Sequence, residues 1–278
     1  MVQTYRNLLP ILLCFAIFVV GLGAYTRLTD SGLGCPDWPA CYGQWIVEKS
    51  IHTPHLSPTD TLKAWTEMIH RYVAGLLGAC IVFTLGQKAW HDKKQARPVA
   101  KIIPVVIALL IIQALFGMWT VTWKLHPLAV MPHLLGGMSL TLCLTWIYYR
   151  PTTETITAIP SPILTWLWIC FALFSLQVIL GGWTSANYAA LVCPDFPTCQ
   201  GQWWPTMHFG EGFSIPPIGP NYEGGLFSGA ARTAIHFSHR IGGLLCALAI
   251  GILCQLTWRN KTTHYCLHFI SKYIINNN

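Results

Sequence analysis

The chain has 278 residues, of which only 10% are charged and 53% are hydrophobic, and its mean hydropathy is +0.47. These values are unusual for a water-soluble domain and favour a membrane protein. The net charge of +7 would suit a nucleic-acid-binding protein, but in so apolar a chain we expect it to mark cytoplasmic segments, and we expect no nucleic-acid partner.

Six segments are apolar enough to cross a bilayer, which takes about 20 residues. They are 7–26, 66–87, 102–123, 127–149, 161–183 and 233–258. The first is too long, and its start too weakly basic, for a cleavable signal peptide. The sequence therefore predicts an all-α, polytopic membrane protein in contact with lipid.

The segment between the second and third spans orients the chain. Residues 88–101 contain five Lys or Arg residues against one acidic residue, Asp92. The positive-inside rule assigns such a loop, and with it the N-terminus, to the cytoplasm. We expect a bacterial inner-membrane protein whose loops after the first and fifth spans are periplasmic.

Those two loops are near-copies of each other. Cys35-Pro-Asp-Trp-Pro-Ala-Cys41-Tyr-Gly-Gln-Trp45 aligns without a gap to Cys193-Pro-Asp-Phe-Pro-Thr-Cys199-Gln-Gly-Gln-Trp203. A repeat this dense indicates a duplicated unit. We expect two halves, residues 1–150 and 151–278, with related chemistry.

Cysteine usage agrees with this orientation. Four of the eleven cysteines form two pairs in the external loops, Cys35 with Cys41 and Cys193 with Cys199, on the side where disulfides persist. Two prolines in each loop help to turn the chain back, so we expect two disulfides. Reduced structural thiols are the alternative; a zinc site fits less well, because zinc knuckles space their cysteines by about two to four residues. The other seven are interpreted as small apolar residues: Cys14, Cys80, Cys143, Cys170, Cys246, Cys254 and Cys266.

Ionisable residues inside membrane spans indicate a functional site. Glu67 and His70 open the second span and share one helix face, and His133 begins the fourth span at similar depth. Two histidines that face each other from neighbouring apolar helices suit the axial positions of a haem iron. Ordinary hydrogen-bonded interior histidines are the alternative.

The second half repeats this pattern with one change. His239-Arg240 matches His70-Arg71, and His236 takes the position of Glu67. We expect the half with the carboxylate to be reactive, because a carboxylate can stabilise cationic character or handle protons.

With these residues, the chain resembles the haem A synthase family, membrane enzymes that complete haem A for cytochrome oxidase. The matching elements are Gly23-Ala-Tyr-Thr-Arg-Leu-Thr-Asp-Ser-Gly-Leu-Gly-Cys-Pro-Asp-Trp-Pro39, Glu67-Met-Ile-His70-Arg71, Pro132-His133, the second Cys-Pro-Asp-Phe-Pro loop and His236-Phe-Ser-His239-Arg240. They extend from residue 1 to about residue 260, and the first is highly specific.

The resemblance implies a duplicated four-helix-bundle unit and a stepwise oxidation of a haem O methyl group to a formyl group, with oxygen from water. In the N-terminal half, His70 and His133 would bind haem O and Glu67 would be catalytic. In the C-terminal half, His239 would bind a haem b cofactor, with His236 nearby. Haem O synthase, cytochrome oxidase assembly proteins and a second copy of the chain are the expected partners.

The resemblance weakens after the sixth span. Family members have eight spans, whereas residues 259–278 are too short and too polar for two more. We expect a C-terminally truncated member in which His239 lacks its second axial ligand, with a premature stop or frameshift as the simplest explanation. A haem-binding protein without synthase activity, or an electron carrier like cytochrome b, is the alternative function.

Overall fold

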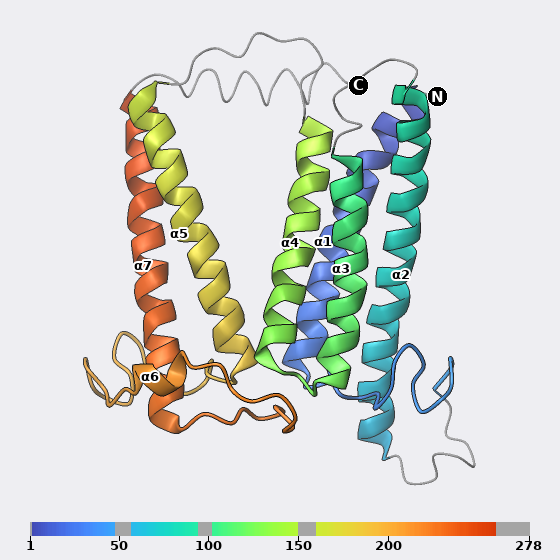
Figure 1. Cartoon of the computed structure of the whole chain (residues 1–278). Helices are drawn as coiled ribbons and strands as arrows, with labels where there is room; N and C mark the ends of the chain where they lie inside the picture. The colour runs from blue at the N-terminus through green and yellow to red at the C-terminus, as the bar shows by residue number, and fades with distance from the viewer. Residues whose placement is uncertain (1, 48–56, 94–101, 150–159, 260–278) are drawn as a thin grey trace. The chain divides into compact units, whose positions relative to one another are not determined.

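The computed structural model describes residues 2–47, 57–93, 102–149 and 160–259, and its regular elements there are all helices (Figure 1). The helices are α1 (Val2–Leu28), α2 (Pro58–Lys93), α3 (Ile103–Thr122), α4 (Pro127–Tyr149), α5 (Ser161–Ala186), α6 (Phe209–Gly212) and α7 (Gly229–Arg259). The expected all-α class is confirmed. The tail from residue 260 onward lies outside the described residues, so the expectation about it stays a prediction.

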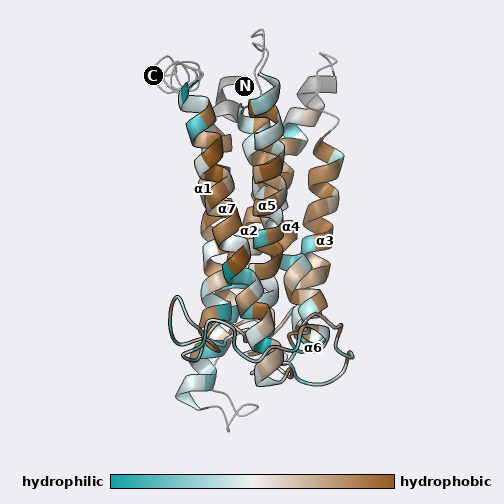
Figure 2. Cartoon of the chain, turned by 90° about the vertical axis from the view of Figure 1, so that its left-hand side faces the viewer, coloured by the Kyte–Doolittle hydropathy of each residue, from teal (hydrophilic) through white to brown (hydrophobic). Residues whose placement is uncertain are grey.

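Six of these helices are long and apolar enough to cross a membrane, which confirms the polytopic membrane fold for the described part of the chain. Figure 2 shows that their middle turns are the hydrophobic ones. The second helix begins eight residues before the predicted span 66–87, at Pro58. Ser57 and Asp60 cap this start, because the N–H of Ser57 donates to Oδ2 of Asp60 over 3.1 Å and the N–H of Asp60 donates to Oγ of Ser57 over 3.1 Å.

The chain divides into two compact units. The first comprises Met1–Thr152 together with Ile215–Leu226, and the second comprises Thr153–Ser214 together with Phe227–Asn278. In the first unit, α1 packs against α2 and α4, and α3 packs against α4, which makes a four-helix bundle. In the second unit, α7 packs against both α5 and α6.

The core of the first bundle is aliphatic. It draws on all four helices, and its buried members are Leu9, Leu12, Ala16, Val19, Leu77, Ile81, Leu85, Ile103, Val106, Leu140, Leu144 and Ile147. Lipid tails are as apolar as these side chains, so within a membrane this core is stabilised by van der Waals packing between the helices. The polar candidate residues lie nearer the other end of the helices, where the two Cys-Pro-Asp loops attach.

The first Cys-Pro-Asp loop packs directly on α2. Cys35 and Cys41 form a small buried cluster with Val47, Ala64 and Met68. A β-carbon at Gly34 would lie 2.5 Å from the carbonyl carbon of Lys63, so the loop approaches the helix backbone more closely than any side chain would permit.

Residues 215–226, which we call the outer strap, belong to the first unit although they come from the loop before α7. Tyr222 is 1% exposed and its ring meets that of the fully buried His126 at a centroid distance of 4.9 Å. Nε2 of His126 lies 3.0 Å from the carbonyl oxygen of Pro216, and the N–H of Tyr222 donates to the carbonyl of Lys124. These contacts fix the strap on the turn between α3 and α4.

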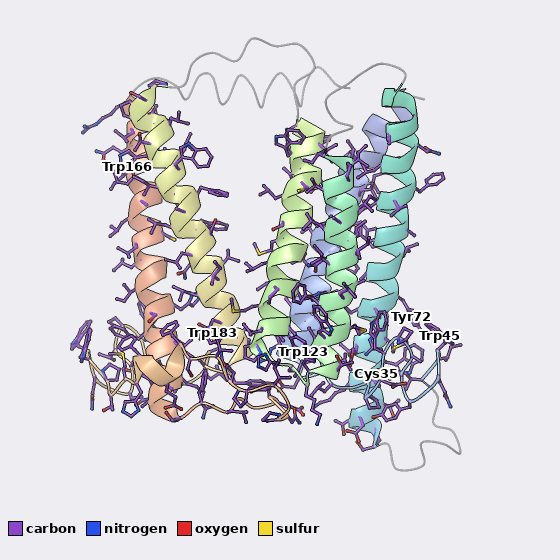
Figure 3. All side chains as sticks on the ribbon, viewed as in Figure 1. Cys35, Trp45, Tyr72, Trp123, Trp166 and Trp183 are labelled. Carbon is purple, nitrogen blue, oxygen red and sulfur yellow. A yellow bond between two sulfur atoms is a disulfide. The ribbon has the colours of Figure 1, made fainter. Side chains whose placement is uncertain are left out.

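Aromatic residues lie near the ends of the spans. Figure 3 shows Trp166 and Trp183 near opposite ends of α5, and Trp123 where α3 ends. Tryptophan is enriched at both membrane interfaces, so these positions fit a spanning helix. Trp183 also donates its indole N–H to the carbonyl of Gly212 over 2.8 Å, which joins α5 to α6.

Candidate haem site

His70 on α2 and His133 on α4 face each other inside the first bundle. Their ring centroids are 6.5 Å apart and their planes are inclined at 88°. Nδ1 of His70 is buried and has no hydrogen-bond partner within the described residues. Buried polar groups are normally paired, so two facing imidazoles that each keep an Nδ1 unpaired among the described residues are unusual for histidines with a purely structural role.

Small residues on the neighbouring helices leave room for both rings. A β-carbon at Gly23 of α1 would lie 3.0 Å from Cε1 of His70, and one at Gly117 of α3 would lie 3.2 Å from Cε1 of His133. Any larger residue would push the imidazoles out of line. The glycines therefore help to hold the two rings toward each other.

The residues present fit a haem iron. A metal–nitrogen bond is about 2 Å long, and the centre of each imidazole ring lies beyond its nitrogen. Two such bonds therefore separate the ring centres by about the distance between the centroids of His70 and His133. The two imidazoles come from different helices of an apolar bundle, which is a setting typical of haem ligation.

Glu67 lies one turn before His70 and is 5% exposed. Its Oε1 pairs with Nη2 of Arg71, and its Oε2 accepts a hydrogen bond from the N–H of Cys35 over 2.9 Å. The carboxylate thus joins the second helix to the first Cys-Pro-Asp loop. A buried carboxylate needs such partners, because an unpaired buried charge is very costly.

Arg71 extends this connection along the loop. Its Nη1 donates to the carbonyls of Asp37, over 3.0 Å, and Ala40, over 2.8 Å. The loop is closed by the Cys35–Cys41 disulfide, and the second loop is closed by Cys193–Cys199. Both disulfides expected from the sequence are therefore present.

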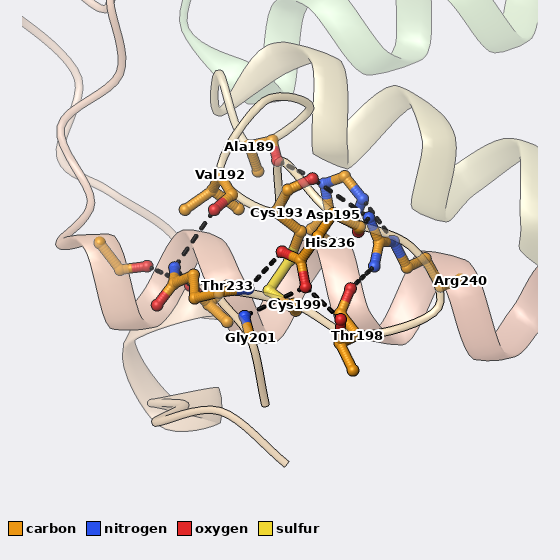
Figure 4. The surroundings of a disulfide bond; sticks show 12 residues. Ala189, Val192, Cys193, Asp195, Thr198, Cys199, Gly201, Thr233, His236 and Arg240 are labelled. Carbon is orange, nitrogen blue, oxygen red and sulfur yellow. Dashed lines mark hydrogen bonds between the residues drawn. A yellow bond between two sulfur atoms is a disulfide. The ribbon is translucent and has the colours of Figure 1, made fainter. Parts of the chain in front are cut away.

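The second loop repeats this construction on α7 (Figure 4). Arg240 donates to the carbonyls of Thr198 and Asp195, over 2.7 Å in each case, and to that of Cys193 over 3.1 Å. The carboxylate of Asp195 accepts hydrogen bonds from the hydroxyl of Thr198 and from two backbone N–H groups of the loop. These hydrogen bonds, that of Thr198 first, hold the pKa of Asp195 below its ordinary value.

His236 takes the position of Glu67 in this network. Its Nε2 accepts a hydrogen bond from Nε of Arg240 over 2.9 Å, so Nδ1 carries the proton and donates to the carbonyl of Ala189 over 2.8 Å. Both nitrogens of His236 are therefore engaged. It is a poor candidate for a metal ligand.

His239 lies one turn further along α7, next to Gly181 of α5. Nε2 of Gln177 donates to Nδ1 of His239 over 2.9 Å and to its backbone carbonyl over 3.0 Å. The other histidines described in this unit are the engaged His236 and His208, whose side chain is 63% exposed. The described residues of this unit thus offer one histidine suited to an iron.

Sequence reasoning gave no role to Gln177 or to the loop-binding arginines. Gln177 was not predicted, because a single glutamine in an apolar helix matches no functional motif. Its signal is a spacing, Gln-x-x-x-Gly, which recurs at Gln113 and Gly117.

Comparison with known proteins places this chain in a family. The family model described as "Cytochrome oxidase assembly protein" matches residues 6–274, beyond residue 260 where the resemblance was expected to end. A protein called heme A synthase from Shewanella oneidensis is 42% identical over 259 residues, covering 88% of this chain and 77% of that protein. Proteins of the same name from Halalkalibacterium halodurans and Wolbachia pipientis are 27% and 28% identical, covering 90% and 85% of this chain and 74% and 76% of their own lengths. The chain therefore belongs to this family of cytochrome oxidase assembly proteins.

Proposed function

We propose that the protein is a haem A synthase, which oxidises a methyl group of haem O to a formyl group and so supplies haem A to cytochrome oxidase. The facing pair His70 and His133 is the observation that carries this proposal. Membership of the cytochrome oxidase assembly family and the names of the relatives support the same activity.

The first unit is the proposed substrate half. His70 and His133 bind the iron of haem O from its two faces and so fix the macrocycle within the bundle. Fixing the substrate in this way brings one edge of it to a constant position, which contributes to catalysis by orientation. The apolar walls of the bundle exclude bulk water from the rest of the ring.

Glu67 is the proposed catalytic residue. Its ion pair with Arg71 allows a charged carboxylate to exist at a site that is almost fully buried. At low dielectric, such a charge strongly stabilises positive charge that develops on the methyl carbon during oxidation. The same carboxylate can orient the water that supplies the oxygen atom and accept its proton.

The second unit is the proposed cofactor half, with haem b held by His239. When bound there, haem b supplies one-electron redox chemistry. His236 completes the hydrogen-bond network of the loop and is not a ligand, because Arg240 and Ala189 engage both its nitrogens. The histidine in place of a carboxylate leaves this half without the group proposed for catalysis.

The proposed setting is the bacterial inner membrane, with the N-terminus cytoplasmic and both disulfide loops periplasmic. The basic 88–101 segment supports this orientation, and the two disulfides suit the oxidising side. Haem O synthase as supplier, oxidase assembly proteins as receivers and a second copy of the chain are the proposed partners.

Expression of the chain beside a haem O synthase, followed by extraction and chromatography of the haems, tests the proposal. We expect a haem A peak that disappears in the His70→Ala variant. Haem O alone, in cells that accumulate the protein in the membrane, would refute the synthase function and leave a haem-binding protein.

A further inference from the structure

Three helix pairs share one arrangement around a histidine. The glycines Gly23, Gly117 and Gly181 on the first helix of each pair face His70, His133 and His239 on the second. A β-carbon on any of these glycines would lie 3.0–3.2 Å from Cε1 of the facing ring. The three imidazoles are therefore comparable, and differences in their surroundings are informative.

Two of the three pairs add a glutamine. Gln113 and Gln177 lie four residues before the facing glycine, and a further glycine, Gly136 or Gly242, lies three residues after the histidine. A β-carbon at Gly136 would lie 1.8 Å from Nε2 of Gln113, and one at Gly242 would lie 2.3 Å from Oε1 of Gln177. These second glycines make the space that each amide occupies.

In the second unit, the amide reaches the histidine. Nε2 of Gln177 lies 2.9 Å from Nδ1 of His239, while Oε1 of the same amide is buried without a hydrogen-bond partner in the described residues. In the first unit, Nε2 of Gln113 and Nδ1 of His133 are both buried and both unpaired within the described ranges. The second unit thus holds an amide in contact with its imidazole, and the first holds a buried amide and a buried imidazole that each lack a partner in the part of the chain that the structure describes.

Iron binding at Nε2 would complete these contacts. It leaves the proton on Nδ1, which then needs an acceptor. The amide oxygen is such an acceptor, and rotation of the terminal amide brings it to the position that the nitrogen holds now. In the second unit this rotation breaks the hydrogen bond from Nε2 of Gln177 to the carbonyl of His239, so the bond to Nδ1–H must offset that loss. A partner of this kind fixes the ring and raises the basicity of the ligating nitrogen.

His70 has no such partner. The positions that correspond to the glutamine and to the second glycine are Val19 and Val73, and both are apolar. Accordingly, Nδ1 of His70 is buried without a hydrogen-bond partner among the described residues. One ligand of the first site therefore shares its helix pair with a buried amide, and the other has valines at the corresponding positions.

We propose that Gln113 and Gln177 are positioning residues for His133 and His239, and that His70 is the exchangeable ligand through which the substrate haem enters and the product leaves. This inference rests on the proposed function, because only a substrate site needs to release its haem in each cycle. The cofactor ligand His239 carries the amide, as a permanently occupied site requires. Outer partners of this kind change metal affinity by about 10–100-fold.

The first test uses the full chain with His239→Ala, so that only the first site contributes haem signals. In this background, Gln113→Leu should speed haem transfer to excess apomyoglobin by about 10–100-fold and raise the midpoint potential, because the imidazole becomes a weaker donor. Gln113→Glu should restore retention and lower the potential below that of the parent, because a carboxylate is a stronger acceptor. Opposite shifts of the midpoint potential in the two Gln113 variants identify a hydrogen bond to the ligand. Potentials that do not shift, or that shift in the same direction in both variants, would overturn the positioning role.

The second test installs the missing amide. The double variant Val19→Gln with Val73→Gly should slow haem release about tenfold or more relative to Val73→Gly alone, which opens the space without supplying the amide. Equal release from these two variants would overturn the exchangeable role of His70.

These readouts do not require haem A formation. A protein that shows the shifts but makes no haem A contradicts the proposed function alone. One that makes haem A without them contradicts the positioning role alone.

Discussion

Arg240 donates its Nε–H to Nε2 of His236 over 2.9 Å, in the same helical spacing in which Arg71 pairs with Glu67. Each half therefore uses an arginine to bind its own loop. The halves differ in the side chain that accepts a hydrogen bond from this arginine. A carboxylate brings a negative charge into the first site, and a neutral imidazole brings none into the second. We propose that this difference in charge helps to distinguish the reaction centre from the cofactor centre.

Removing the charge of Glu67 should separate binding from chemistry. Glu67→Gln keeps an acceptor for the N–H of Cys35, so we expect bound haem with a normal spectrum and no haem A. Glu67→Ala leaves the largely buried guanidinium of Arg71 without its carboxylate partner and should also lower the free energy of unfolding by about 3–5 kcal/mol. Haem chromatography and thermal unfolding in detergent measure the two effects.

Glu223→Gln is the matched control, because this partly exposed carboxylate forms an ion pair with Lys63 at 3.9 Å, away from the proposed site, and its loss should leave both measurements unchanged. Normal haem A yield from Glu67→Gln would remove the negative charge of Glu67 from the mechanism.

Each loop arginine should act on its own loop. Arg240→Lys loses the planar guanidinium that reaches three carbonyls at once, and hydrogen bonds to charged groups contribute about 1.5–3 kcal/mol each. Amide hydrogen exchange in residues 195–201 should therefore become about tenfold faster or more. Arg71→Lys should do the same for the first loop only, and a variant that loosens both loops equally would contradict independent attachment.

The disulfides should be visible as protected thiols. In protein purified without reductant and then denatured, a maleimide should modify seven of the eleven cysteines, because four are in Cys35–Cys41 and Cys193–Cys199. After reduction, all eleven should react. Mass spectrometry of the intact chain counts the labels, and more than seven before reduction would show that a pair is not bonded.

Much of the fold follows from hydrophobic runs and from the internal repeat. Apolar segments of the right length predicted all six spans, because a lipid-facing helix must satisfy its own backbone. The start of α2 was missed by eight residues, although Ser57 and Asp60 have the spacing of a capping box. The first turns of α2 are polar, so hydropathy alone did not predict that the helix begins at Pro58.

The remaining features depend on contacts distant in sequence. Tyr222 lies in a loop rich in proline and glycine, and nothing local indicates that it packs on His126, 96 residues earlier. The contact of Gln177 with His239 likewise depends on the close approach of α5 and α7 at Gly242. Periodicity predicts which face of a helix is buried, but it does not predict which side chains meet there.

The second loop should respond to acid through Asp195. Its pKa is lowered in the folded loop, chiefly by the hydroxyl of Thr198 and then by backbone N–H groups, so the ionised form stabilises the loop. That stabilisation is fully present above the unfolded pKa of about 3.9 and is lost as the pH falls through the lower folded value. Amide exchange at Gln200 and Gly201 should therefore accelerate in acid, beyond its intrinsic pH dependence.

Asp195→Asn should show faster exchange at neutral pH and little further acceleration in acid, because an amide accepts the backbone hydrogen bonds only weakly and does not titrate. Thr198→Val keeps the carboxylate but removes its main stabilising donor, so its acid transition should move to higher pH. If all three proteins lose protection at the same pH, a group other than Asp195 controls the loop.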